Sequence, residues 1–314
     1  MTLISTPGNP VPDGAVAGKV RTPDGVELRF ARWDAPAGGK GTVCVFGGRG
    51  EFIEKYFETM AELRQRGFAV AALDWRGQGH SSRQLPDPRK GHVENFSEYE
   101  IDLETFMQQV VLPNCPRPHF ALTHSMGGAV VLRAAHAGRR WFERAVLVAP
   151  MIDFPRAWIA RPLRGLARAA RQAGLGKVSV PSGNVDRIRT SRFVGNPLTS
   201  DSRRYARNAA IVGADPTLGI SAPTVAWLDA AFDTVVAFRT EDYPSQIDQP
   251  TLMLAAGADT IVSSAAIARF AARLAFGSHR LIEGARHEIL QERDGCRAQL
   301  WAAFDAFVPG ASTI

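Results

Sequence analysis

Ser125 stands in a stretch whose pattern suits a nucleophile. The stretch Thr123-His-Ser-Met-Gly127 separates a short apolar run, 120–122, from a run of small and aliphatic residues. The first run predicts a buried strand and the second a helix packed closely on a sheet. A serine on such a sharp turn presents its hydroxyl above the end of the sheet, where a base can reach it. The usual pattern is Gly-x-Ser-x-Gly, and Thr123 replaces the first glycine, so the partners of the serine must be sought elsewhere.

The base that would activate this serine must be an imidazole, which takes up the hydroxyl proton as the oxygen attacks. The chain has seven histidines: His80, His92, His119, His124, His136, His279 and His287. On strand-turn-helix scaffolds the order along the chain is serine, acid, histidine, which excludes the four that precede Ser125. His136 falls in the helix after the turn, and His279 starts a strand. His287 alone lies in a loop after the last predicted strand, so we predict that it is the base.

An acid is needed to hold that histidine in one tautomer. Asp259 lies in a turn after the preceding predicted strand, at an interval from His287 that has room for one helix and one strand. Both loops would then reach the edge of the sheet formed by the carboxyl ends of its strands. We predict that Asp259 is the acid. The competing acid is Asp153, which follows the strand ending at Ala149, and an ordinary turn aspartate is the non-catalytic interpretation.

The negative oxygen formed when a serine attacks a carbonyl needs backbone N–H donors. Met126 follows the nucleophile and opens a helix, whose dipole favours negative charge. The second donor is expected from the loop Gly47-Gly-Arg-Gly50, whose glycines allow close approach of the backbone to a ligand. We predict the backbone N–H of Arg49 as this donor and Gly48 as a substrate contact. The Arg49 side chain is either solvated or directed at an anionic group of the substrate.

Short apolar runs alternate with helical patterns along most of the chain. A hairpin is predicted around Thr22-Pro-Asp-Gly25, followed by buried strands at 42–46, 68–73, 120–122, 144–149, 250–255 and 279–282. Helices are predicted at 54–66, 96–111, 127 onward, 263–274 and 288 onward. This rhythm is typical of a mostly parallel sheet that is covered by helices on both faces.

The rhythm breaks between residues 151 and 244, which lack short buried strands. We predict an inserted helical cap there, on a core formed by residues 1–150 and 245–314. Helical runs at 202–212 and 223–238 belong to it, and Trp227 in the second is a candidate contact for an acyl chain or, equally, a core residue.

One predicted cap helix carries arginines at helical spacing: Arg161, Arg164, Arg168 and Arg171. Apolar residues could supply its other side: Trp158, Ile159, Leu163 and Leu166. One interpretation is a cap helix packed on the core with a solvated arginine face. The other is a basic amphipathic helix that rests on anionic lipid.

The composition is ordinary for a globular protein of 314 residues, with 45% hydrophobic and 22% charged residues and a net charge of +6. Basic residues are not interleaved with aromatic ones, so nucleic acid is not an expected partner. No apolar run is long enough to cross a membrane, and the first ten residues lack the features of a signal peptide. The three cysteines are too scattered for a disulfide framework or a metal site. We expect a cytoplasmic protein, with peripheral contact to the inner face of the cell membrane if the basic helix binds lipid.

Four motifs carry a family resemblance: 123–128, Gly47-Gly-Arg-Gly-Glu-Phe52, Asp74-Trp-Arg-Gly-Gln-Gly-His-Ser81 and Gly91-His-Val93. They resemble the monoglyceride lipase and lysophospholipase group of α/β-hydrolase fold serine hydrolases, the bacterial lysophospholipases of the L2 type in particular, over about residues 25–310. The resemblance implies carboxylic ester hydrolysis without a metal or an organic cofactor, most simply a lysophospholipase that works through an acyl-enzyme. A monoacylglycerol lipase or general carboxylesterase is the alternative. A non-catalytic binding protein of the same fold is a remote one, because such proteins usually lack part of the triad.

Overall fold

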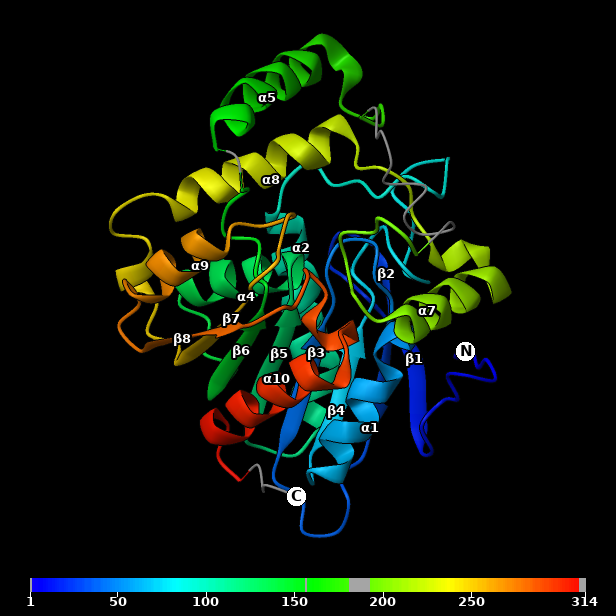
Figure 1. Cartoon of the computed structure of the whole chain (residues 1–314). Coiled ribbons are helices and arrows are strands. Elements are labelled where there is room, and N and C mark those ends of the chain that lie inside the picture. The colour runs from blue at the N-terminus through cyan, green and yellow to red at the C-terminus, as the bar shows by residue number, and fades with distance from the viewer. Residues whose placement is uncertain (1, 156, 181–192, 311–314) are drawn as a thin grey trace.

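A single eight-stranded sheet runs through the computed structural model, which describes residues 2–155, 157–180 and 193–310 (Figure 1). Its spatial order is β1-β2-β4-β3-β5-β6-β7-β8. The strands are β1 (Ala15–Arg21), β2 (Glu27–Trp33), β3 (Thr42–Phe46), β4 (Ala69–Leu73), β5 (His119–His124), β6 (Arg144–Val148), β7 (Thr251–Ala256) and β8 (Gly277–Ile282). The predicted strands are thus confirmed, with bounds that differ by a few residues.

The sheet is antiparallel at one edge and parallel elsewhere. β1 and β2 form the predicted hairpin, with Ala15 opposite Trp33 and Arg21 opposite Glu27, and β2 pairs antiparallel with β4. Strands β3 to β8 pair in parallel with their neighbours. The central strands β3, β4, β5 and β7 are buried along their whole length, because helices cover both faces of the sheet.

The direction of each crossover decides which face a helix covers. The chain moves from β3 to β4 in one direction across the sheet, and from β4 to β5 and beyond in the other. Right-handed crossovers therefore put α1 (Phe57–Gln65) on one face and α2 (Ser97–Phe106), α4 (Met126–His136) and α9 (Ser264–Ala271) on the opposite face. The terminal helix α10 (Asp294–Phe307) lies with α1, in front of the sheet in Figure 1.

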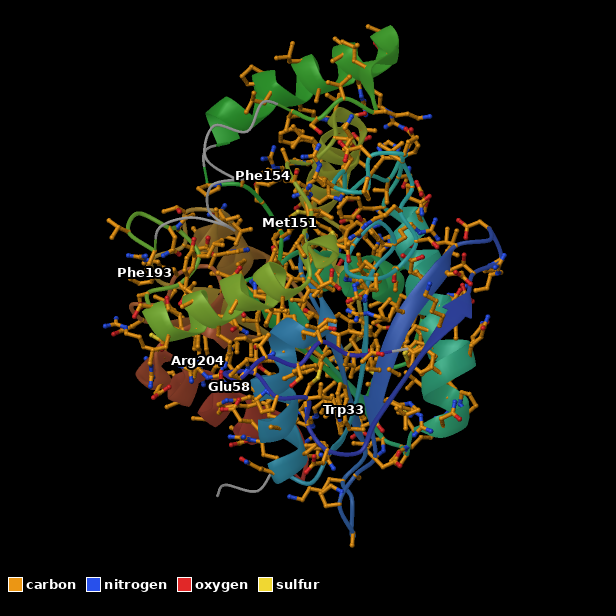
Figure 2. All side chains as sticks on the ribbon, turned by 90° about the vertical axis from the view of Figure 1, so that its right-hand side faces the viewer. Trp33, Glu58, Met151, Phe154, Phe193 and Arg204 are labelled. Atoms are coloured by element: carbon orange, nitrogen blue, oxygen red, sulfur yellow. The ribbon has the colours of Figure 1, made fainter. Side chains whose placement is uncertain are left out.

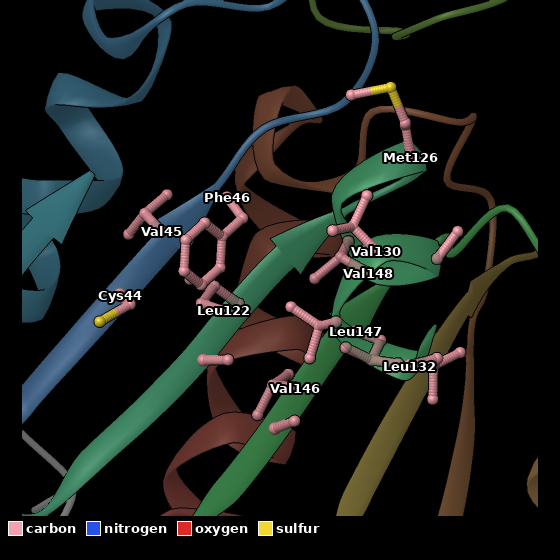
Figure 3. Packing of buried hydrophobic residues seen from close by; sticks show 14 of the residues in the cluster. Cys44, Val45, Phe46, Leu122, Met126, Val130, Leu132, Val146, Leu147 and Val148 are labelled. Carbon is pink, nitrogen blue, oxygen red and sulfur yellow. The ribbon is translucent and has the colours of Figure 1, made fainter. Parts of the chain in front are cut away.

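The core beneath the α2 and α4 face is dense around the end of β3. Phe46 makes edge-to-face contacts with Phe106 and Phe142, each at 5.9 Å between ring centroids. Figure 3 shows the aliphatic side chains of β5 and β6 packed against those of α4, with Met126 at the start of that helix above the strand ends. This packing holds the turn between β5 and α4 on a rigid base.

The chain between β6 and β7 lies over the carboxyl ends of the parallel strands (Figure 1). Its longer helices are α5 (Ala157–Ala170), α7 (Ser202–Ala214) and α8 (Val225–Phe238). Figure 2 shows Met151 and Phe154 in the space between α5 and the sheet. Arg204 of α7 binds Glu58 of α1 at 2.6 Å, which ties this segment to the helices below it (Figure 2).

Two arginines of α5, and Arg171 just beyond it, are paired with carboxylates, which neither interpretation of the sequence includes. Arg164 and Arg168 bind Asp233 of α8 at 3.1 and 2.6 Å. Arg171, just beyond α5, binds Asp229 at 3.1 Å and Glu94 at 3.0 Å. The leucines take the opposite side, where Leu163 is 45% and Leu166 67% exposed. The side chains of Trp158, Ile159 and Arg161 lie outside the described residues.

The length and composition of the helices determine whether any of them could cross a membrane. In the described part of the chain, no helix combines the length and the apolar composition needed to cross a bilayer.

Candidate active site

The turn from β5 to α4 holds Ser125 in an uncommon backbone conformation, with φ 49° and ψ −114°. A non-glycine residue with positive φ is strained and persists only where its surroundings fix it. Here the Ser125 N–H donates to the Val148 carbonyl at 3.0 Å, and the Ser125 carbonyl accepts from Gly128 and Met151 at 3.1 Å each. Gly127 is required by close approach, because a Cβ there would lie 2.7 Å from the Phe46 carbonyl oxygen. The turn therefore fixes the direction of the Ser125 hydroxyl.

Ser125, His287 and Asp259, predicted from three separate loops, form a chain of contacts that begins at this hydroxyl. His287 Nε2 lies 3.0 Å from Ser125 Oγ, and His287 Nδ1 lies 2.8 Å from Asp259 Oδ2. A carboxylate only accepts hydrogen bonds, so the proton of the neutral imidazole is on Nδ1. Nε2 is then left with its lone pair toward the serine O–H. This is the geometry in which a histidine removes a proton from a serine.

The Asp259 carboxylate is held from both sides. Its Oδ1 accepts the backbone N–H groups of Ile261 and Val262 at 2.7 and 3.0 Å, while Oδ2 faces His287. Burial alone would raise the pKa of Asp259, but the hydrogen bond and charge of His287, with the two backbone donors, hold that pKa below its usual value. The competing acid, Asp153, binds Arg239 at 2.7 Å instead, so the structure does not bring it to the histidine.

The two predicted oxyanion donors belong to residues that line one cavity with Ser125. Met126 is the first residue of α4, where a backbone N–H has no partner within the helix. Arg49 lies in the loop between β3 and α1, and it lines the same cavity as Ser125 and Met126. The N–H groups on either side of Arg49 are committed elsewhere, that of Gly48 to the Glu51 carboxylate and that of Gly50 to the Gln78 side chain. Gly48 lines the cavity, and a Cβ there would lie 3.1 Å from Ser125 Cβ.

The loop 74–81 packs against the Arg49 loop and holds it through hydrogen bonds. Trp75 Nε1 donates to the Gly47 carbonyl at 2.9 Å, and the Gln78 side chain also contacts the Gly48 carbonyl at 3.4 Å. Asp74 accepts the Ile53 N–H at 2.9 Å and binds the fully buried Arg29 at 2.6 Å. The sequence marks 74–81 as a tight polar loop, and its contacts make it a support for the Arg49 loop.

A cavity of about 430 Å³ opens onto Ser125, between the sheet and the segment above it. Its lining is mainly apolar and includes Met151, Phe154, Leu198, Val212, Leu228 and Ile261. Trp227 also lines it, while the Trp227 indole N–H donates to the Tyr99 hydroxyl of the core at 3.0 Å. The Arg49 side chain reaches the same segment, donating to the Ser221 carbonyl at 2.6 Å and lying 5.2 Å from the centroid of Trp227. A volume of this size accommodates a small organic ligand with a hydrocarbon part.

Comparison with known proteins places this chain in a family. The family model described as "Serine aminopeptidase, S33" matches residues 38–294. The chain belongs to this family. Lysophospholipase L2 of Escherichia coli is 33% identical over 299 residues, which cover 90% of this chain and 85% of that protein.

Two solved structures share the fold. A carboxyl esterase from Bacillus coagulans has a TM-score of 0.77 at 18% identity, covering 95% of this chain and 99% of that one. A soluble variant of monoglyceride lipase from Saccharomyces cerevisiae has a TM-score of 0.74 at 20% identity, covering 95% of this chain and 97% of that one. These likenesses show the α/β-hydrolase fold, and the family match and the 33% identical relative show that the chain is a hydrolase.

Next to the predicted catalytic residues of this hydrolase lies a buried group of titratable side chains, which we call the floor cluster: Glu51, Lys55, His124 and Glu288. Lys55 Nζ lies 2.6 Å from Glu51 and 2.7 Å from Glu288. His124 Nδ1 lies 3.0 Å from Glu51 Oε2, and the Tyr56 hydroxyl donates to the same oxygen. All four members also line the cavity, so the enzyme keeps a charged floor under an apolar pocket.

The sequence does not identify the floor cluster, although its members adjoin residues that the sequence does single out. Glu51 follows the glycine loop, His124 precedes the nucleophile and Glu288 follows the base. A titratable residue next to each of three predicted site residues is a usable signal. The contacts themselves join residues as far apart as 51 and 124, which no local pattern reveals.

Proposed function

We propose that this hydrolase is a lysophospholipase, which releases a fatty acid from a lysophospholipid through an acyl-enzyme. The observation that carries the proposal is the chain of contacts from Ser125 through His287 to Asp259, opening onto an apolar cavity. The cavity suits an acyl chain, and the 33% identity to a protein named lysophospholipase L2 favours this substrate.

In the proposed reaction, Ser125 Oγ attacks the ester carbonyl while His287 Nε2 takes the hydroxyl proton. The N–H groups of Met126 and Arg49 stabilise the negative oxygen, and Asp259 keeps the imidazolium oriented. His287 then protonates the departing glycerol oxygen as the carbonyl reforms. Water attacks the acyl-enzyme with His287 as the base, which returns the proton to Ser125 and releases the fatty acid.

Monoacylglycerol hydrolysis is the second candidate, and the basic residues of the cavity favour it. Among the cavity residues that the structure describes, Lys55 is held by Glu51 and Glu288, and the Arg49 guanidinium donates to the Ser221 carbonyl. A neutral glycerol head group would need neither cation. A general carboxylesterase would use the same catalytic groups on smaller esters.

Substitution of Ser125 by Ala tests the catalytic assignment. We expect loss of p-nitrophenyl ester cleavage, and of labelling by a fluorophosphonate probe, with an unchanged melting temperature. In a serine protease, loss of the nucleophile costs about 10⁶-fold in kcat. Retained hydrolysis or labelling would refute the assignment, and failure of the wild type to react would favour a binding protein.

Relative kcat/KM values on lysophosphatidylcholine, lysophosphatidylethanolamine, monoacylglycerol and short p-nitrophenyl esters test the substrate. A preference for either lysophospholipid supports the first candidate, and a preference for monoacylglycerol supports the second. Preference for the short esters alone would contradict both lipid assignments.

We also propose that residues 151–244 form a cap domain over a core of residues 1–150 and 245–314, and that the cap meets a membrane. The exposed Leu163 and Leu166 favour an apolar contact in place of an arginine contact, because Arg164 and Arg168 are paired with Asp233. Such a protein would act in the cytoplasm at the inner face of the membrane, where its free cysteines would stay reduced.

Flotation with liposomes distinguishes the two kinds of contact. We expect the wild type to bind neutral and anionic vesicles alike and in high salt, and Leu166→Glu to bind neither, with Leu281→Glu as the exposed control on β8. Binding that needs anionic lipid and disappears in salt would restore the arginine interpretation.

A further inference from the structure

His124, the residue before the nucleophile, lies between two oxygen atoms. Its Nδ1 is 3.0 Å from Glu51 Oε2, and its Nε2 is 3.1 Å from the backbone carbonyl oxygen of His287. The side chain is almost fully buried. Both neighbours are therefore acceptors at hydrogen-bonding distance, and the predicted catalytic mechanism uses neither contact.

The two acceptors determine the protonation state. A neutral imidazole has one N–H donor and one lone pair, so one of its nitrogens would face an oxygen lone pair without a proton between them. An imidazolium donates from both nitrogens and satisfies both acceptors. Loss of one of these buried hydrogen bonds would leave an unpaired polar atom, which is unfavourable.

We propose that His124 is an imidazolium that acts as a positioning residue, joining the loop of the catalytic base to the oxyanion loop. It holds the base loop through the His287 carbonyl. It holds the oxyanion loop through Glu51, whose carboxylate also accepts the Gly48 N–H next to Arg49. Its role rests on the proposed function of Ser125 and His287.

The charges of the floor cluster balance only in this state. Glu51 and Glu288 supply two negative charges, and Lys55 between them supplies one positive charge. The imidazolium of His124 is the second positive charge. Burial by itself lowers the pKa of His124, but the charge of Glu51 and its hydrogen bond raise that pKa above the ordinary value.

The two hydrogen bonds of His124 affect the reaction rate, because each of the loops that they join holds a reacting group. His287 Nε2 must stay near 3 Å from Ser125 Oγ, and the Arg49 N–H must meet the oxyanion. The rings of His124 and His287 lie 4.8 Å apart between centroids. Loss of the hydrogen bond to the His287 carbonyl would therefore free the backbone of the base itself, and its ring could move relative to Ser125. A misplacement of about 1 Å can cost about 100-fold in rate.

Nitrogen-15 NMR of histidine-labelled enzyme tests the protonation state directly. We expect one histidine whose two ring nitrogens both carry protons at pH 7.5, with a signal that His124→Gln removes and that His279→Gln leaves in place. A neutral His124 at that pH would overturn the proposal. The test is independent of activity, so it stays informative if Ser125→Ala refutes the catalytic assignment.

Kinetics of His124→Gln test the positioning role. Glutamine is neutral, and both of its N–H donors sit on one nitrogen, so it cannot reproduce the two separate charged donors of the imidazolium. We therefore expect kcat to fall about 100-fold with KM nearly unchanged. The rate of fluorophosphonate labelling should fall to a similar extent. The control His279→Gln, on β8 away from the site, should match the wild type. An unchanged kcat in folded His124→Gln would refute the role, and a fall in melting temperature without a change in kcat would reduce His124 to a structural residue.

Discussion

The protein contains two clusters of opposite charges that are built from similar groups in different surroundings. The floor cluster lies under Ser125, and its four side chains are at most 11% exposed. The second cluster, which we call the cap pairs, joins Arg164, Arg168 and Arg171 to Asp229 and Asp233. Apart from the buried Asp229, its side chains are 32–44% exposed.

Exposure changes what each cluster contributes. Water screens the cap pairs, so each contributes about 0–1 kcal/mol and adds little beyond orienting α5 on α8. The floor cluster is desolvated, and removal of one partner would leave a buried charge without compensation. The comparison indicates that the floor cluster fixes geometry near the reacting atoms, while the cap pairs let α5 turn its leucines outward.

The largest difference should appear in catalysis, between two aspartates with different partners. Asp259 faces His287, whereas Asp153 faces Arg239 of the chain between β6 and β7. We expect Asp259→Asn to lower kcat about 10⁴-fold, as loss of the acid does in a serine protease, because the histidine then adopts the wrong tautomer. Asp153→Asn should keep kcat within a few-fold. Steady-state hydrolysis of a p-nitrophenyl ester measures both, and equal losses would contradict the division.

The next effect is on stability. Glu51→Gln removes a buried charge that faces Lys55 and His124, so we expect the free energy of unfolding to fall by about 3–5 kcal/mol. Urea denaturation followed by circular dichroism measures the change. A loss below about 1 kcal/mol would place the floor cluster in the same class as the cap pairs.

A smaller effect depends on pH. Burial by itself lowers the pKa of His124, but the charge and hydrogen bond of Glu51 raise that pKa above its ordinary value of 6.5. The stability that it contributes is thus full below pH 6.5 and disappears as pH rises through the raised pKa, by at most about 1.4 kcal/mol per pH unit for one proton.

The pKa values of three neighbouring groups, Lys55, Tyr56 and Glu51, are moved away from that range. His287 and Glu288, which also lie near His124, are common to the wild type and to His124→Gln. The charges of Glu288 and Glu51 outweigh burial and raise the pKa of Lys55, burial raises that of Tyr56, and His124 and Lys55 outweigh burial to keep that of Glu51 low. The free energies of unfolding in urea of the wild type and His124→Gln should therefore approach each other as the pH rises from about 6 to about 9. A gap that widens with pH would contradict the imidazolium.

The smallest effect should lie in the cap. Asp233→Asn breaks half-exposed pairs with Arg164 and Arg168, so we expect a loss of unfolding free energy below about 1 kcal/mol. The loss should shrink further in 1 M NaCl, where screening is stronger. A loss as large as that of Glu51→Gln would show that exposure is not what separates the two clusters.

Local patterns in the sequence predict the features that depend on chain order. The strands, the hairpin and the meeting of Ser125 with Asp259 and His287 all follow from apolar runs and the order of loops along one sheet edge. The partners of charged side chains are not local. Arg168 meets Asp233 across 65 residues, a pairing that neither interpretation of the arginine helix included. Helical spacing shows that arginines share a face, but it does not show which way the face points.

Thr123 explains why a stricter pattern search would pass over this chain. A Cβ on Gly128 would lie 3.0 Å from Thr123 Oγ1, so the second glycine after Met126 makes the room that the first position of the motif usually leaves. The Thr123 hydroxyl is buried and has no hydrogen-bond partner among the described residues. The contact therefore depends on the volume of the Thr123 side chain and not on its hydroxyl. A search that required small residues at the positions of Gly127 and Gly128, and allowed a side chain of modest size at the position of Thr123, would detect strand-turn-helix motifs of this type that lack the first glycine of Gly-x-Ser-x-Gly.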